Sequence, residues 1–131
     1  MNKTLTKADI GSFGEKQCVK YLKKNGFRIL DKNARIGHLE ADIIAYNKTH
    51  LIFVEVKTRR TDMNNILRPA AAVDKNKKSN LISFAKAYVK TLSAKFIDKQ
   101  ISIDVCEITV YQDKGKLKID SLNYINNAVS R

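Results

Sequence analysis

Two apolar segments joined by a short polar turn constrain the fold of this chain more than any other feature. Residues 38–46 (HLEADIIAY) and 51–57 (LIFVEVK) are rich in apolar and β-branched residues, and residues 47–50 (NKTH) connect them. This pattern is typical of a β-hairpin. If Tyr46 and Leu51 close the hairpin, opposed residues have numbers that sum to 97. A slip of one residue would mix apolar and polar faces, so the pattern favours this register.

The two faces of the predicted hairpin differ in character. One face is entirely apolar and consists of Ala41, Ile43, Ala45, Ile52, Val54 and Val56. On the other face, Asp42 lies opposite Glu55. One step further along, Glu40 faces Lys57. Opposed Cβ atoms are roughly 5 Å apart, and like charges there are destabilising, so the two acids need a neutralising partner.

Three partners would neutralise this acid pair: a proton on one carboxyl, a cationic side chain, or a divalent metal. Lys57, about 7 Å further along the strand, is the candidate cation. Mg²⁺, or Mn²⁺ in its place, is the candidate metal, because a hard cation takes one or two carboxylates and keeps waters. The ligands would then be Asp42 and Glu55, helped by the Val56 carbonyl. Lys57 would orient or activate a water that attacks a phosphodiester.

A predicted helix before the hairpin supplies a further acid, Glu15. Thr6 and Asp9 resemble a capping box, and Asn25-Gly26 is a typical C-terminal stop. Glu15 projects to the edge of the apolar face of this helix rather than among its lysines. A carboxylate there needs a partner or water, so Glu15 would complete the metal shell directly or through water.

The other expected elements give the order αβββαββ, a single α/β sandwich. They are a strand at 27–32, a basic loop at 58–69, a helix at 74–93, and strands at 101–110 and 116–120. The last segment, 121–131, would add a helical turn or two. Asp104 is expected to be a polar residue that faces the edge of the sheet.

The excess of positive charge indicates a polyanionic partner. The 131 residues include 25 Lys and Arg against 13 Asp and Glu, a formal net charge of +12. Nucleic acid is the first candidate and an acidic membrane surface the second, with a solubilising lysine-rich surface as the alternative. The candidates for phosphate contact are Arg59, Arg60, Lys75, Lys77 and Lys78. The lysines open a helix, where cations oppose the macrodipole, although a solvated helix start explains them equally well.

Cysteine usage and hydropathy favour a cytoplasmic protein without a membrane anchor. Cys18 and Cys106 belong to no Cys/His cluster, so two reduced thiols packed in the core are expected. His38 and His50 have no ligand partner at useful spacing and are expected at the surface. No signal-peptide pattern opens the chain, and no apolar run approaches membrane-spanning length.

The acids and the lysine of the hairpin resemble a nuclease signature. Asp42, followed on the next strand by Glu55-Val56-Lys57, is similar to the PD-(D/E)xK motif. Over nearly its whole length the chain resembles the YraN family of predicted endonucleases, which are distantly similar to archaeal Holliday junction resolvases. The matching segments are GSFGEKQCVKYLKKNGFRIL, NAR at 33–35, LEADIIA, FVEVKTRR, KNKKSNLISFAKAYV, IDV at 103–105 and INNAV.

This resemblance implies one restriction-endonuclease-like domain over residues 1–131, with a mixed central sheet flanked by helices. The implied active-site set is Glu15, Asp42, Glu55 and Lys57, and we assign Glu40 a supporting role. The implied activity is metal-dependent hydrolysis of DNA, at branched, Holliday-junction-like or flap structures. RNA stays open as a substrate, and a junction-cutting role would favour a homodimer.

The sequence departs from the pattern of its relatives at two positions. Leu39 occupies a position where the family usually has Gly, and Ala41 stands where the wider superfamily has proline.

Two other functions are alternatives to a nuclease. One alternative is a non-catalytic nucleic-acid-binding module that keeps the fold, and another is a basic RNA- or ribosome-associated protein. Asp42 and Glu55 argue against a pure binder, which gains nothing from opposed carboxylates beside phosphate.

Overall fold

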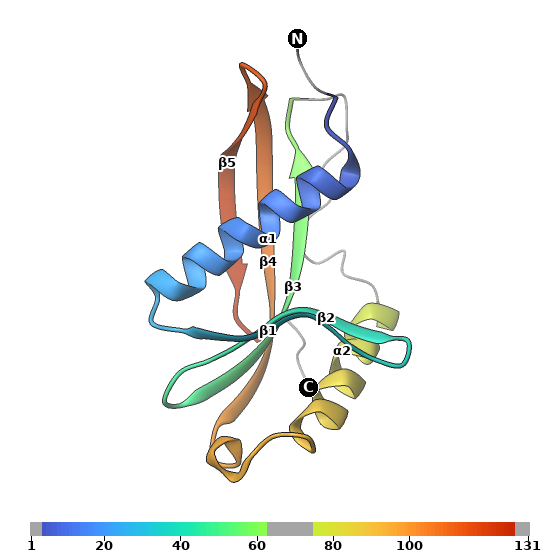
Figure 1. Cartoon of the computed structure of the whole chain (residues 1–131), viewed down its shortest axis with the longest axis vertical. Helices are drawn as coiled ribbons and strands as arrows, with labels where there is room; N and C mark the ends of the chain where they lie inside the picture. The colour runs from blue at the N-terminus through green and yellow to red at the C-terminus, as the bar shows by residue number, and fades with distance from the viewer. Residues whose placement is uncertain (1–3, 63–74, 128–131) are drawn as a thin grey trace.

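The computed structural model describes residues 4–62 and 75–127, and their elements follow the predicted order (Figure 1). The elements are α1 (Lys7–Lys24), β1 (Arg28–Ile36), β2 (Leu39–Tyr46), β3 (His50–Arg60), α2 (Lys75–Val89), the 3₁₀ helix η2 (Ala94–Phe96), β4 (Gln100–Asp113) and β5 (Lys116–Ile125). The predicted α/β class and the order αβββαββ are confirmed. Part of the predicted basic loop, residues 63–69, lies outside the described ranges.

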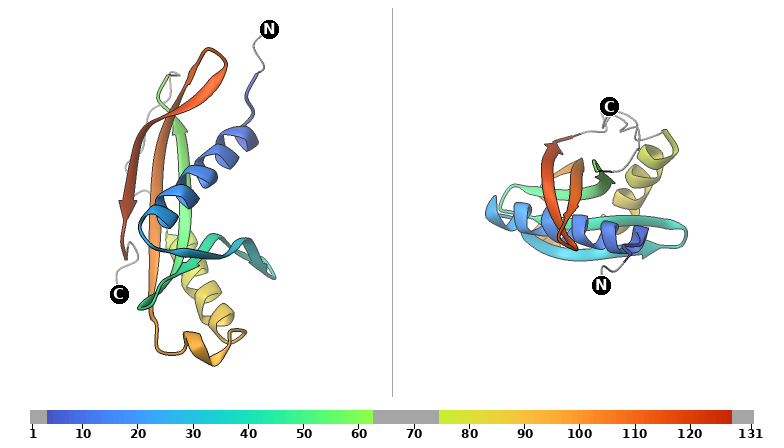
Figure 2. Two further views of the ribbon diagram at one scale, coloured as in Figure 1. Left: turned by 60° about the vertical axis from the view of Figure 1, so that its left-hand side comes forward. Right: turned by 90° about the horizontal axis from the view of Figure 1, so that it is seen from above.

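The strands form one mixed sheet in the order β1-β2-β3-β4-β5. β3 and β4 are parallel, and the other neighbouring pairs are antiparallel. The β1–β2 hairpin runs across the long direction of β3, β4 and β5 (Figure 2). This strong twist makes β2 leave β3 partway along its length, which matters for the acidic residues below.

Each helix covers one face of the sheet, because side chains of a strand alternate between the faces. The α1 side buries a cluster that includes Cys18, Leu22, Ile43, Ala45, Ile52, Val54, Cys106, Ile108 and Val110. The α2 side buries Ala34, Ala41, Ile44, Leu51, Phe53, Leu81, Phe84, Ala85, Phe96 and Ile103. On β3 the odd-numbered side chains therefore face α2. Glu55 and Lys57 continue that odd-numbered series.

The ends of α1 follow the sequence signals. Thr6 accepts a hydrogen bond from the Asp9 amide, and the Asp9 carboxylate accepts one from the Thr6 amide, as in a capping box. Gly26 follows the helix with a φ of 88°, a conformation that favours glycine. The Phe27 amide donates to the Leu22 carbonyl and completes the stop.

Several predicted boundaries are wrong. β3 continues to Arg60, so the first residues of the predicted basic loop belong to the sheet. β5 continues to Ile125 where a helical turn was expected, because Val105 of β4 pairs with Ile125. The Tyr124 ring also packs on Tyr21 of α1, with ring centroids 5.1 Å apart. Tertiary pairing outweighs the weak local preference of this polar segment.

The predicted apolar face of the hairpin is wrong at Ala41. Ala41 packs in the α2-side cluster instead of joining Ile43 and Ala45, because the hairpin twists across the sheet.

Cys18 and Cys106 are both buried and free, which confirms the prediction of core-packed thiols. In the described part of the chain, no helix is long and apolar enough to cross a membrane.

Candidate active site

The strands β2 and β3 separate where their acidic residues begin. Tyr46 pairs with Leu51, as the sequence predicts, and the ladder runs to the pair Ile43–Val54. Beyond that pair a side chain replaces the backbone contact: Asp42 Oδ2 accepts a hydrogen bond of 2.8 Å from the Val56 amide. Asp42 thus spans the opening between the strands instead of forming a ladder pair opposite Glu55.

The same geometry places a carbonyl at this opening. In a strand, the N–H and C=O of one residue point to the same neighbour. The Val56 N–H points at Asp42, on the edge that β2 has left. The Val56 carbonyl therefore faces that edge too, beside the Asp42 carboxylate.

Asp42 is held in an environment that disfavours its charge. The pKa of Asp42 is raised to about 7, with burial as the largest cause and the charge of Glu55 as the next. The carboxylates of Glu15 and Glu40 act in the same direction, while the Val56 amide opposes them. Such a carboxyl gains most from a cation that binds next to it.

Two lysines approach Glu55, whose side chain is only 14% exposed. Lys77 of α2 places its Nζ 3.4 Å from Glu55 Oε1, and Lys57 Nζ lies 4.0 Å from the same atom. Burial and the neighbouring Lys77 lower the pKa of Lys57, and Glu55 offsets this only in part. Lys57 is therefore more easily deprotonated than an ordinary lysine, which suits a group that handles protons.

A close contact between α1 and β3 brings Glu15 to this region. A Cβ on Gly14 would lie 1.8 Å from Thr58 Oγ1, so only glycine allows the helix to approach the strand here. Thr58 directly follows Lys57, and Glu15 directly follows Gly14. The helix thus carries Glu15 close enough for its charge to affect Asp42.

Glu40, the predicted supporting acid, forms an ion pair with a residue of β1. Glu40 pairs with Arg35 across β1 and β2, with 3.1 Å between Arg35 Nη2 and Glu40 Oε2, and both side chains are more than half exposed. The predicted position of Glu40 opposite Lys57 is wrong, because the β2–β3 ladder ends before it reaches Glu40.

The predicted phosphate-contacting residues fall into different environments. Arg60 donates to both carboxylate oxygens of Asp62, at 2.8 and 2.7 Å, and its side chain is only 16% exposed. Arg59 lies on β3 and Lys78 on α2, both half-buried. Lys75 begins α2, and its side chain lies outside the described part of the structure. Lys77 reaches the acids, with its Nζ 3.4 Å from Glu55 Oε1.

The acids do not form a preassembled cage. Within residues 4–62 and 75–127, no three His, Cys, Asp or Glu side chains are close enough together to hold a metal by themselves. Two carboxylates with a carbonyl, supplemented by water, remain the available ligand set: Asp42, Glu55 and Val56. Mg²⁺ typically binds through one or two carboxylates and keeps several waters, so this set fits it.

The structure gives Lys77 a contact that the sequence did not predict, and it adds Glu107, which the sequence did not single out. Lys77 was expected to contact phosphate or to lie at a solvated helix start, and its contact with Glu55 depends on how α2 packs on the sheet. Glu107 of β4 is the register partner of Lys57, and its buried Oε2 has no hydrogen-bond partner among the described residues. The alternation along β4 is the one sequence signal that places Glu107 on the face of Lys57.

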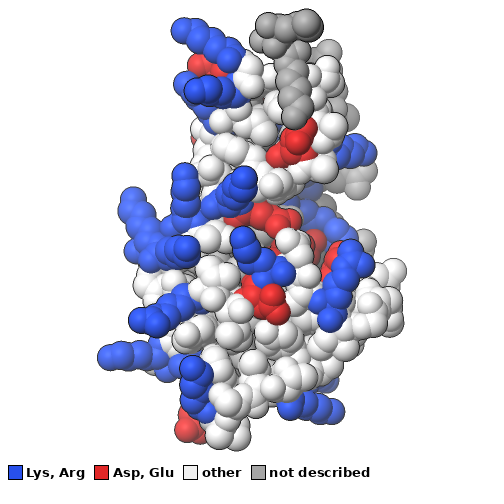
Figure 3. Space-filling view, viewed as in Figure 1, with Lys and Arg blue, Asp and Glu red and all other residues white. Residues whose placement is uncertain are grey.

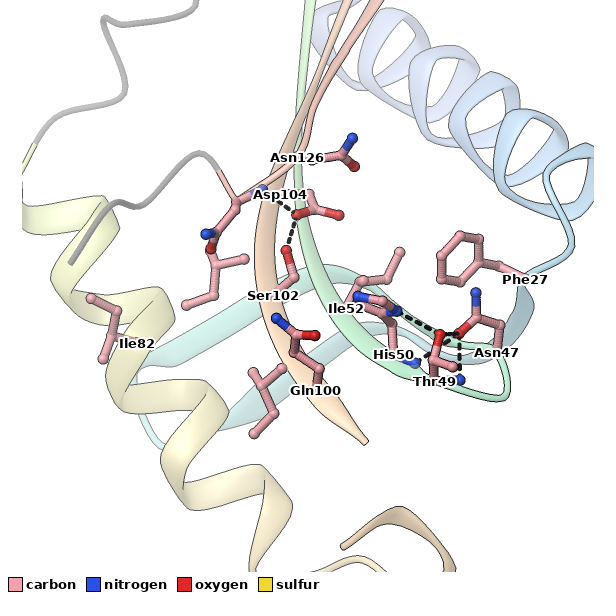
Figure 4. A pocket seen from close by; sticks show the side chains of 13 residues that line it. Phe27, Asn47, Thr49, His50, Ile52, Ile82, Gln100, Ser102, Asp104 and Asn126 are labelled. Atoms are coloured by element: carbon pink, nitrogen blue, oxygen red, sulfur yellow. Dashed lines mark hydrogen bonds between the residues drawn. The ribbon is translucent and has the colours of Figure 1, made fainter. Parts of the chain in front are cut away.

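A cavity of about 700 Å³ lies at the other end of β3 and does not belong to this site (Figure 4). It is lined by His50 and Gln100 among others, and by Asp104. Asp104 is 2% exposed and accepts hydrogen bonds from Ser102 Oγ at 2.5 Å, Tyr124 Oη at 2.6 Å and the Asn127 amide at 2.8 Å. The expectation of an edge-facing Asp104 is wrong, because these donors make its burial favourable.

Comparisons with known proteins match most of the chain to one family. The model of the uncharacterised protein family UPF0102 matches residues 14–108. A UPF0102 protein of Caldanaerobacter subterraneus is 40% identical over 126 residues, which are 96% of this chain and 98% of that protein. A UPF0102 protein of Dictyoglomus thermophilum is 39% identical over 83% of this chain and 88% of its own.

Solved structures with low sequence identity show a partial likeness. Hjc of Archaeoglobus fulgidus, a Holliday junction resolvase, is 15% identical with a TM-score of 0.42, and the match covers 91% of this chain and 90% of Hjc. SfsA of Pyrococcus furiosus, solved with Ca²⁺, is 14% identical with a TM-score of 0.42, over 88% of this chain and 61% of SfsA.

Proposed function

This chain belongs to the UPF0102 family, and we propose that it is a divalent-metal-dependent endonuclease that hydrolyses phosphodiester bonds of DNA. The YraN family that the sequence resembles is this same family. The proposed hydrolysis depends on the residues at the opening between β2 and β3.

One observation carries the proposal: the Asp42 carboxylate is bound to the Val56 amide at the point where β2 leaves β3. This bond fixes Asp42 beside the strand that carries Glu55 and Lys57. Acids and an amine from two strands thereby share a half-buried opening. A protein that only bound nucleic acid would gain nothing from acids gathered where phosphates approach.

Asp42 and Glu55 would hold Mg²⁺ or Mn²⁺, with the Val56 carbonyl as a further ligand and Glu15 acting through water. The bound metal would lower the pKa of water and stabilise charge on the phosphate. The ligand atoms are all oxygens, which suits a hard cation. Binding would also relieve the repulsion that raises the pKa of Asp42.

Lys57 would handle the proton of the attacking water. Its pKa is lowered by burial and by Lys77, so its Nζ holds a proton less firmly than an ordinary lysine. A neutral Nζ would accept a hydrogen bond from the water and orient it, and a protonated Nζ would stabilise charge on the phosphoryl oxygens.

The positive charge of the surface supports a nucleic acid as the substrate. Lys and Arg side chains are spread over the face seen in Figure 3, and acidic side chains gather towards its middle. A net charge of +12 attracts a phosphate backbone, and Arg59 and Lys78 are the proposed contacts near the acids. Branched DNA is the first substrate to test.

The test compares cutting of linear, single-stranded and four-way-junction DNA with and without Mg²⁺ or Mn²⁺. We expect metal-dependent cutting by the wild type, and a loss of roughly 10²–10³-fold in Glu55→Ala and Lys57→Ala. Binding of DNA should persist in both variants, because the phosphate contacts remain.

Matched controls remove a similar acid and lysine away from the site. Asp113 and Lys118 form an exposed pair on β4 and β5, with 3.1 Å between their charged atoms. Asp113→Ala and Lys118→Ala should cut like the wild type. DNA binding without cutting under every metal condition would reject the enzyme and favour a non-catalytic binding module.

A further inference from the structure

Lys77 forms an ion pair with the carboxylate of Glu55, one of the two proposed metal ligands. Its Nζ lies 3.4 Å from Glu55 Oε1, closer than Lys57 Nζ at 4.0 Å. An ammonium group and a divalent cation repel each other when they share one carboxylate oxygen. The metal-free protein therefore already contains a cation where the metal would bind.

Of the two lysines, Lys77 is the one that is able to leave. Lys57 sits on β3, paired with Glu107 of β4 and two residues from Glu55, and its side chain is 25% exposed. Lys77 reaches the site from the first turn of α2, and its side chain is 48% exposed. A long, half-exposed lysine side chain changes rotamer at little cost, so it can swing from Glu55 towards solvent.

We propose that Lys77 is the resident counter-ion of Glu55, that a divalent metal displaces it, and that the displaced Lys77 then contacts a phosphate of the bound nucleic acid. The phosphate must approach the metal to be cut, so an ammonium displaced from Glu55 lies next to it. This inference rests on the proposed function, because it takes Asp42 and Glu55 as the metal ligands.

The first test measures metal affinity without nucleic acid. In calorimetric titrations with Mn²⁺, Lys77→Ala should bind the metal roughly 3–5-fold more tightly than the wild type, because a partly exposed competing ion pair is removed. Lys86→Ala is the matched control, since it removes the same charge from an exposed position of the same helix. Equal affinities of the Lys77 and Lys86 variants would overturn the proposal.

The second test measures DNA affinity in a Lys57→Ala background, which blocks cutting. Adding Lys77→Ala should leave metal-free affinity unchanged, because Glu55 already holds Lys77. With Mn²⁺ present, the same change should weaken binding several-fold. An equal loss with and without Mn²⁺ would show a phosphate contact that is independent of metal. No loss in either condition would show a purely structural ion pair. Both results contradict the proposal.

Metal binding by the wild type distinguishes a failure of the proposed function from a failure of the role of Lys77. If the wild type binds no Mn²⁺, the proposed function and the displacement of Lys77 both fail. If the wild type binds Mn²⁺ and cuts DNA while Lys77→Ala binds the metal no more tightly, only the role of Lys77 fails.

Discussion

Asp104 and Asp42 are two carboxylates on neighbouring parts of one sheet, and their surroundings are opposite. Asp104 is 2% exposed and accepts hydrogen bonds from two hydroxyls and an amide. Asp42 accepts one amide hydrogen bond and has the charges of Glu55 and Glu15 nearby. The protein satisfies Asp104 with three donors, whereas Asp42 is placed among like charges.

This difference separates a structural acid from the acid that we propose as a metal ligand. Asp104 joins the start of β4 to Tyr124 and Asn127, which lie at the end of the described chain. Asp42 links no comparable set of donors among the described residues, and the charges of its acidic neighbours repel its own. Burial alone therefore does not mark a candidate functional carboxylate, whereas burial beside other acids does.

The largest effect is expected at Asp104. Asp104→Ala would leave the Tyr124 hydroxyl, the Ser102 hydroxyl and the Asn127 amide without their acceptor. We expect the free energy of unfolding to fall by about 4 kcal/mol, measured by urea denaturation. A loss under 1 kcal/mol would show that Asp104 is as weakly satisfied as Asp42 and would break the comparison.

Asp42 should make stability depend on pH in the metal-free protein. Its pKa is raised to about 7 by burial, Glu55, Glu15 and Glu40, so between pH 4 and 7 the folded state keeps a proton that the unfolded state releases. The free energy of unfolding should therefore fall as pH rises through this window, by on the order of 2 kcal/mol.

Asp42→Asn is the control for that pH dependence. It removes the titrating group and should flatten the slope, measured by urea denaturation at several pH values in a chelating buffer. An identical slope in the variant would mean that Asp42 has an ordinary pKa and that its neighbours do not repel it.

A smaller effect is expected where α1 approaches the site. Gly14→Ala would place a Cβ 1.8 Å from Thr58 Oγ1, which forces the helix and Glu15 away from β3. We expect a loss of roughly 1–2 kcal/mol in unfolding free energy. Gly11→Ala is the matched control, because nothing lies within 4 Å of its Cβ, and it should be neutral or stabilising.

The sequence predicted those features that depend on neighbouring residues. The register that pairs Tyr46 with Leu51 follows from the alternation of apolar side chains, and it places Glu55 and Lys57 on one face. The caps of α1 follow from Thr6 and Asp9. In each case the interacting groups lie within one element or one hairpin.

Features that depend on distant contacts were missed. The burial of Asp104 requires Tyr124, 20 residues later, and Tyr124 lies in the part of β5 beyond residue 120, where a helical turn was expected. The contact between Lys77 and Glu55 spans 22 positions and requires α2 to pack over β3. No periodicity of the sequence encodes these distances, so they could only be found in the folded chain.

The most direct test of the central claim is a calorimetric titration of Mn²⁺ at pH 8 into three proteins: the wild type, Asp42→Asn and Asp113→Asn. The wild type and Asp113→Asn should bind Mn²⁺ with equal affinity, because Asp113 is an exposed acid away from the site. Asp42→Asn should bind at least about 50-fold more weakly, since it loses a charged ligand. Equal affinity in all three proteins, or no binding to the wild type, would contradict a metal site at Asp42.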